Sequence, residues 1–199
     1  MRINSYSSIP EKCCLFLSEW RKEVSMTNYE RFKLKGATKI LDNQLDRLAN
    51  KHLRIAVYGK AGVGKSSLLN ALINSEFFAT DVANGSTRKT ATTLWREKIK
   101  SLKEIELIDT PGIDEINLKT SNRFLSRLLL QVDLILFVLD GDISSTELTA
   151  LKILLKKGKP IQIILNRCDQ WTKDEQNQLI KSIKKRLPSA INHLKIHTI

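Results

Sequence analysis

Eight consecutive residues, GKAGVGKS from Gly59 to Ser66, have the types and spacing that suit phosphate binding. They match the pattern GxxxxGK[ST] without a mismatch, after an apolar segment and before the helix-forming segment SSLLNALI. Glycines permit positive φ, so backbone N–H groups can approach an anion closely. Lys65 would neutralise β- and γ-phosphate charge, and the Ser66 hydroxyl would ligate Mg²⁺. The residues expected to contact a nucleotide here are Gly59, Lys60, Ala61, Gly62, Val63, Gly64, Lys65, Ser66 and Ser67.

A second motif, Asp109-Thr110-Pro111-Gly112, ends the apolar segment EIELIDT. A carboxylate at the C-terminal end of a buried parallel strand lies where an α/β sheet presents its ligands. We therefore expect Asp109 to hold Mg²⁺ through water, and the Gly112 N–H to contact a γ-phosphate.

A third motif, Asn166-Arg167-Cys168-Asp169, follows the apolar segment PIQIILN. Asp169 can accept two hydrogen bonds from N1 and the exocyclic amino group of guanine, a donor pair that adenine lacks. Asn166 would brace the loop and approach the purine N7 edge. The planar Arg167 guanidinium could stack on the base. The motif predicts a preference for GTP and GDP, and an ATPase is the alternative reading.

These motifs need a sheet and helices to position them, and the pattern from residue 53 onward predicts both. Val/Ile/Leu-rich segments separated by helical segments indicate an α/β fold: a three-layer P-loop NTPase sheet, mostly parallel with one antiparallel edge strand. The expected strands are 53–59, 92–99, 104–110, 132–139 and 160–166, with a further one at 193–199; the expected helices are 65–74, 117–130, 145–157 and 172–187.

The first quarter of the chain has a different pattern. Apolar residues recur at helical intervals over 10–24 and 29–51. We predict an N-terminal helical extension, residues 1–52, that precedes a GTP-binding domain, residues 53–199. These helices carry no residues whose chemistry we can name, so their expected role is to bind a protein partner or to pack.

Composition indicates an ordinary cytoplasmic protein. The three cysteines show no CxxC spacing, and no signal peptide is visible. The net charge of +12 is uneven: residues 152–199 hold eleven Lys/Arg against three Asp/Glu. Lys181, Lys184, Lys185 and Arg186 form a basic helical face that could attract RNA or an anionic membrane surface, which would make the protein peripheral to that membrane. A merely solvated lysine-rich face is the alternative.

Together, GKAGVGKS, DTPG and NRCD resemble the motifs of translation-factor-related P-loop GTPases, over roughly 53–187. DTPGI and a Gly-Ser-Thr-Arg stretch are similar to the Era/TrmE-like group. This resemblance implies that Thr87 closes on Mg²⁺ and the γ-phosphate, so Ser66, Thr87 and Asp109 would be the metal residues, and Lys65 and Thr87 the catalytic ones. Thr90 is the alternative to Thr87.

Several positions depart from the pattern of such enzymes. Ile113 stands where many Ras-like enzymes have a water-orienting Gln, so we expect slow hydrolysis. Gly62 replaces an Asn that binds potassium in relatives, so potassium stimulation is not expected. Ser189-Ala190 precedes the last expected strand and is not expected to supply the family's terminal guanine-contacting loop. We therefore expect an incomplete guanine pocket or a chain that is short at its C-terminus. A switch with slow GTP hydrolysis is the predicted function. A truncated, non-catalytic scaffold is the alternative.

Overall fold

The structure is a computed structural model, and it describes residues 9–79, 90–99, 101–114 and 128–199. The chain divides into two compact units. One comprises Met1–Leu53 with Glu97–Glu104, and the other comprises Arg54–Arg96 with Ile105–Ile199. The second unit contains all three motifs.

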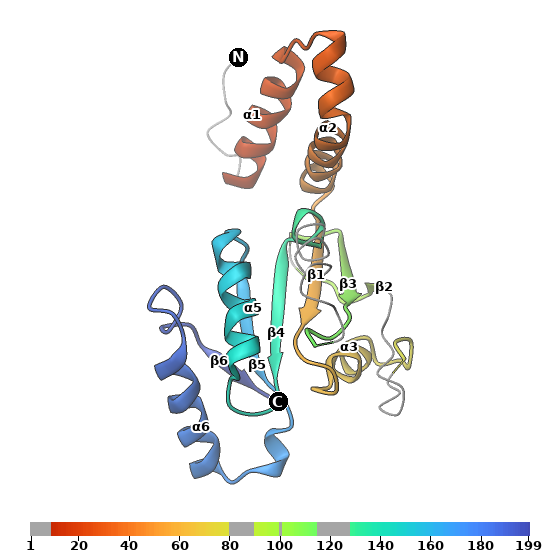
Figure 1. Cartoon of the computed structure of the whole chain (residues 1–199). Helices are drawn as coiled ribbons and strands as arrows, with labels where there is room; N and C mark the ends of the chain where they lie inside the picture. The colour runs from red at the N-terminus through yellow and green to blue at the C-terminus, as the bar shows by residue number, and fades with distance from the viewer. Residues whose placement is uncertain (1–8, 80–89, 100, 115–127) are drawn as a thin grey trace. The chain divides into compact units, whose positions relative to one another are not determined.

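A six-stranded sheet with the strand order β2-β3-β1-β4-β5-β6 organises the motif-bearing part of the chain (Figure 1). The parallel pairs include β1–β4, β4–β5 and β5–β6, whereas β2 runs antiparallel to β3 at the edge. The bounds are β1 His52–Tyr58, β2 Ala91–Trp95, β3 Glu104–Asp109, β4 Leu134–Leu139, β5 Ile161–Leu165 and β6 Ile196–Thr198. The predicted fold class, with one antiparallel edge strand, is confirmed.

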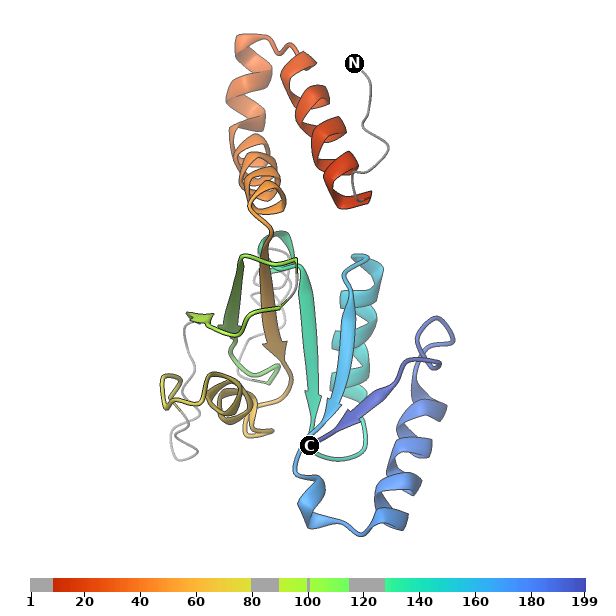
Figure 2. The same cartoon turned by 180° about the vertical axis from the view of Figure 1, so that it is seen from behind.

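The central strands are apolar on both faces because helices cover the sheet. Helix α5, Ser145–Lys156, lies in front of β5 in Figure 1 and behind it in Figure 2, with β4 beside them. Its residues Leu151 and Leu154 belong to the same buried cluster as Phe137 of β4 and Ile163 of β5. This packing fixes the carboxyl ends of the strands, from which the functional loops emerge.

The N-terminal cap of the helix that follows the phosphate loop differs from those of two other helices of this unit. Helix α5 and helix α6, Lys173–Arg186, both begin with a capping box, Ser144 with Glu147 and Thr172 with Glu175. Helix α3, Lys65–Ile73, begins instead at Gly64 in the left-handed region, and no side chain caps it. The N-cap residue of α3 thus gives no side-chain cap bond, which suits a helix start that binds an anion.

Two predicted elements differ in extent. The strand expected at 92–99 ends at Trp95, before the charged residues Arg96 to Lys98. The helix expected at 117–130 falls mostly outside the described residues, of which 128–131 are helical. The last expected strand is present as the short β6, which pairs with β5.

The first unit contains a helical hairpin. Helix α1 spans Ile9–Glu23 and helix α2 spans Asn28–Ala49, with a capping box formed by Thr27 and Glu30 at the start of α2. The Arg21 guanidinium donates to both carboxylate oxygens of Asp42, at 2.8 and 3.2 Å, and so ties the two helices together. No residue described in α2 is fully buried, so the hairpin has little core of its own.

Candidate nucleotide site

The GKAGVGKS loop connects β1 to α3 and turns through two glycines with positive φ, +77° at Gly62 and +88° at Gly64. Other glycines are required by space: a Cβ on Gly59 would lie 2.3 Å from the Val138 carbonyl oxygen. The loop is thus packed directly against β4, and its backbone is held where few other residues fit.

The two lysines of the loop have different partners. Lys65 is 7% exposed, and its Nζ donates to the Lys60 carbonyl oxygen at 2.5 Å. The Lys60 Nζ lies 3.5 Å from Oε2 of Glu147, whose side chain is only 3% exposed. The Lys60 side chain is therefore directed to the start of α5, so Lys60 would meet a phosphate through its backbone and Lys65 through its ammonium group.

Ser66 and Asp109 meet although 43 residues separate them. The Ser66 Oγ donates to Asp109 Oδ2 at 2.5 Å, and Asp109 is 1% exposed at the end of β3. A hydroxyl and a carboxylate fit Mg²⁺, which takes few protein ligands and completes its shell with water and phosphate oxygens. In the described residues no group of three or more His, Cys, Asp or Glu side chains is placed to hold a metal ion.

The DTPG turn packs on the phosphate loop. The Ile113 N–H donates to the Gly59 carbonyl at 3.1 Å, and a Cβ on Gly112 would lie 2.6 Å from the Ala61 nitrogen. The Ala61 N–H itself donates to Asp114 Oδ1 at 2.9 Å. Ile113 is 8% exposed and packs in the core cluster, so its side chain faces the protein interior.

The NRCD motif reaches the phosphate loop from the other side. The Asn166 Nδ2 donates to the Val63 carbonyl at 2.9 Å, and it lies 2.3 Å from the place of a Cβ on Gly64. The Arg167 guanidinium donates to the Gly62 carbonyl at 2.7 Å and to Asp140 Oδ2 at 3.3 Å. Arg167 thus connects the NRCD loop to the phosphate loop and to the loop after β4.

Asp169 lies in a short 3-10 helix, Cys168–Gln170, and is exposed. The loop is held around it: the Gln176 Nε2 donates to the Cys168 carbonyl at 2.6 Å, and the Cys168 N–H donates to the Ile199 carbonyl at 2.9 Å. The exposed Asp169 carboxylate lies at the position from which the sequence predicts contact with guanine.

Thr87, its alternative Thr90 and Ser67 are the remaining predicted residues of this site. Thr87 lies outside the described residues, whereas Thr90 is exposed just before β2 and Ser67 is exposed in the first turn of α3. Sequence reasoning gave no role to Asp114, Glu147 and Gln176. Only Glu147 carried a local signal, the capping-box pattern with Ser144.

Comparison with known proteins agrees with this geometry. The family model described as "50S ribosome-binding GTPase" matches residues 54–167. GTPase Der of Haemophilus ducreyi is 26% identical over 91% of this chain and 36% of its own length. The tRNA modification GTPase MnmE of Lactobacillus delbrueckii subsp. bulgaricus is 35% identical over 69% of this chain and 32% of its own length. The chain spans about a third of the length of these relatives.

Solved structures show the same fold at low identity. Translation elongation factor SelB from Methanococcus maripaludis, in complex with the GTP analogue GppNHp, has a TM-score of 0.56 and 22% identity over 74% of this chain and 29% of its own. Toc33 from Arabidopsis thaliana, in complex with Mg²⁺ and GMPPNP, has a TM-score of 0.51 and 16% identity over 81% of this chain and 76% of its own. With the family match over residues 54–167, the chain belongs to the 50S ribosome-binding GTPase family of P-loop GTPases, as its Era/TrmE-like motifs predicted.

Proposed function

We propose that the chain is a Mg²⁺-dependent guanine-nucleotide switch that hydrolyses GTP slowly. The observation that carries this proposal is the convergence of Lys65, Ser66 and Asp109 at one end of the phosphate loop, with Asn166 and Arg167 bonded to the loop carbonyls of Val63 and Gly62. Phosphate-binding and base-binding groups thus share one framework. We also propose the domain division at residues 52 and 53 and a cytoplasmic location.

The proposed roles follow from the chemistry of each group. Lys65 and the loop N–H groups would stabilise charge that develops on the phosphates during in-line attack by water. Ser66, Thr87 and Asp109 would hold Mg²⁺, which supplies further charge neutralisation when bound. Asn166 would brace the base loop, and Asp169 would select guanine. Because Ile113 is buried and apolar, no side chain at that position orients the water, and hydrolysis is expected to be slow.

GTP turnover and bound nucleotide, measured on the full chain and on Lys65→Ala, test this proposal. We expect wild type to bind GTP in preference to ATP and to turn it over, and Lys65→Ala to lose most of both activities. Lys152→Ala is a matched control because Lys152 is an exposed lysine on α5. Binding without turnover would instead support the non-catalytic scaffold, which the buried Ile113 favours. Equal competition by ATP would overturn the role of Asp169.

We further propose a polyanion-binding role for the basic C-terminal region, with RNA or an anionic membrane surface as the partner. Lys181 and Lys185 are exposed on α6 and Lys184 is half-buried. The Arg186 side chain already has partners within the chain, since its guanidinium donates to the Ile143 carbonyl and lies 3.2 Å from the Asp142 carboxylate. The three lysines, rather than all four basic residues, are the expected contact face. In the described residues no helix is long and apolar enough to cross a bilayer.

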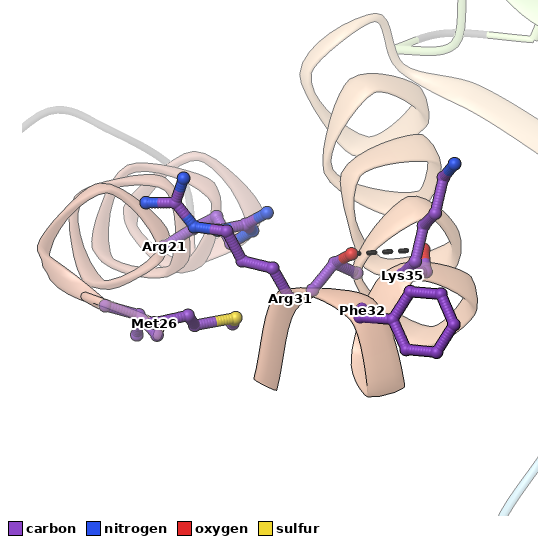
Figure 3. A pocket seen from close by; sticks show the side chains of 7 residues that line it. Arg21, Met26, Arg31, Phe32 and Lys35 are labelled. Carbon is purple, nitrogen blue, oxygen red and sulfur yellow. Dashed lines mark hydrogen bonds between the residues drawn. The ribbon is translucent and has the colours of Figure 1, made fainter. Parts of the chain in front are cut away.

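The helical hairpin is the proposed site of a protein partner. Phe16 is 69% exposed and Phe32 is 82% exposed, an unusual degree for aromatic side chains. A cavity of about 510 Å³ at the bend is lined by Arg21, Val24, Met26, Arg31, Phe32, Lys35 and Thr38, as Figure 3 shows. Apolar and basic side chains in one concave site suit an amphipathic segment with acidic residues.

A further inference from the structure

The turn after β3 places a carboxylate on the phosphate loop itself. The Ala61 N–H donates to Asp114 Oδ1 at 2.9 Å. Backbone N–H groups of such loops are the donors that bind phosphate oxygens. Asp114 therefore gives one of these donors an anionic oxygen from within the chain, the same kind of partner that a nucleotide would offer.

The neighbours of Asp114 hold its carboxylate in this place. Ile113 is anchored by its N–H, which donates to the Gly59 carbonyl at 3.1 Å, and by its buried side chain. Gly112 is in such close contact with Ala61 that a Cβ would approach the Ala61 nitrogen to 2.6 Å. Asp114 itself is exposed, so it can leave the loop without disturbing the core.

The position of the turn decides which phosphate would meet this charge. The DTPG motif predicts that the Gly112 N–H contacts the γ-phosphate, and Gly112 lies against Ala61. The Asp114 carboxylate is thus at the γ-phosphate end of the loop. GTP carries a negatively charged group there that GDP lacks, and like charges at close range raise the free energy of the bound state.

We propose that Asp114 is a specificity-determining residue that competes with the γ-phosphate for the phosphate loop and biases the protein toward GDP. This inference rests on the proposed function. GTP binding would have to displace the carboxylate from Ala61 or tolerate it nearby, whereas GDP binding requires neither. Asp114 thereby sets how readily the switch enters its GTP state.

Dissociation constants of the full chain for GDP and for the non-hydrolysable analogue GMPPNP, in wild type and Asp114→Asn, test the proposal. Asn keeps the shape and an acceptor oxygen but removes the charge. We expect the preference for GMPPNP over GDP to rise roughly 3- to 10-fold at low salt, chiefly through tighter GMPPNP binding. The difference should shrink in 1 M salt because screening weakens exposed charges. Asp114→Ala should have the same or a larger effect.

Asp142→Asn is the matched control, since this carboxylate lies in the loop after β4 and accepts from the Ser182 hydroxyl of α6. It should leave the preference unchanged. An unaltered preference in both Asp114 variants, or an equal change for both nucleotides, would overturn the role of Asp114 while leaving the proposed function intact. Failure of wild type to bind either nucleotide would overturn both.

Discussion

The two ends of the candidate site are built in different ways. At the phosphate end, a Cβ on Gly59, Gly64 or Gly112 would lie only 2.3 to 2.6 Å from a neighbouring atom, and Lys65 and Asp109 are buried. At the guanine end, Asp169 is exposed and the Arg167 side chain is 41% exposed. Phosphate is recognised by backbone N–H groups and charge, which require a rigid cradle. A base is recognised by side chains, so it is enough that the backbone of these residues is fixed while the side chains stay exposed.

The largest effect is expected from Asp169→Ala, which breaks the guanine end alone. Two charge-assisted hydrogen bonds to guanine would be lost, at about 1.5–3 kcal/mol each, so the preference for GDP over ADP should fall roughly 1,000-fold. Because Asp169 is exposed, the melting temperature should not change. Competition titrations with both nucleotides check this. A retained guanine preference would remove Asp169 from the site.

Gly64→Ala should break the phosphate end. The φ of +88° is unfavourable for alanine, and the new Cβ would displace the Asn166 amide from Val63. We expect the free energy of nucleotide binding to become about 3 kcal/mol less favourable, which is roughly 100-fold weaker binding. Gly62→Ala is the matched variant, because the φ of Gly62 is also positive but no atom lies within 4 Å of the new Cβ. We therefore expect a loss of only about 1 kcal/mol in binding free energy. Equal losses in both variants would contradict the importance of the Asn166 contact.

Arg167→Lys tests the guanine end more finely, and we expect a smaller loss of nucleotide affinity from it. Lysine can still reach the Gly62 carbonyl but not Asp140 at the same time. The Arg167–Asp140 pair is half-exposed at 3.3 Å, and such pairs contribute about 0.2–1 kcal/mol. Nucleotide affinity should therefore fall only about 2- to 5-fold. Asp140→Asn should have a similar effect, and the double variant should add little. A loss above about 30-fold would show that the guanidinium itself contacts the base.

The smallest effect concerns the helix that supports the guanine end. The Thr172 backbone N–H and hydroxyl donate to the Glu175 carboxylate and lower its pKa below its ordinary value in the folded chain. A lowered pKa stabilises the fold above the unfolded pKa, and the contribution disappears as pH falls through the folded pKa. Glu175→Gln should slightly lower the melting temperature at pH 7 and lower it less at pH 3. Equal shifts at both pH values would exclude an ionic cause.

Local sequence signals were sufficient for the sheet and for the three motifs. Apolar segments marked the strands, and glycine spacing marked the phosphate loop. The sequence did not give every element boundary. Strand β2 ends at Trp95 because charged residues follow it, and the alternation of apolar residues alone does not define this boundary. The contact of Asn166 with Val63 joins residues 103 positions apart, and no local pattern encodes such a pairing.

By itself the sequence determined which motifs this protein carries: a phosphate loop, a carboxylate at a strand end and a loop predicted to select guanine, in their order along the chain. Only the tertiary structure decided what surrounds that chemistry. It directs Lys60 to Glu147, ties Arg167 to Asp140 and places Asp114 on Ala61. The physical reason is that motifs arise from short-range backbone requirements, whereas these ion pairs and hydrogen bonds depend on which strand ends the fold brings together.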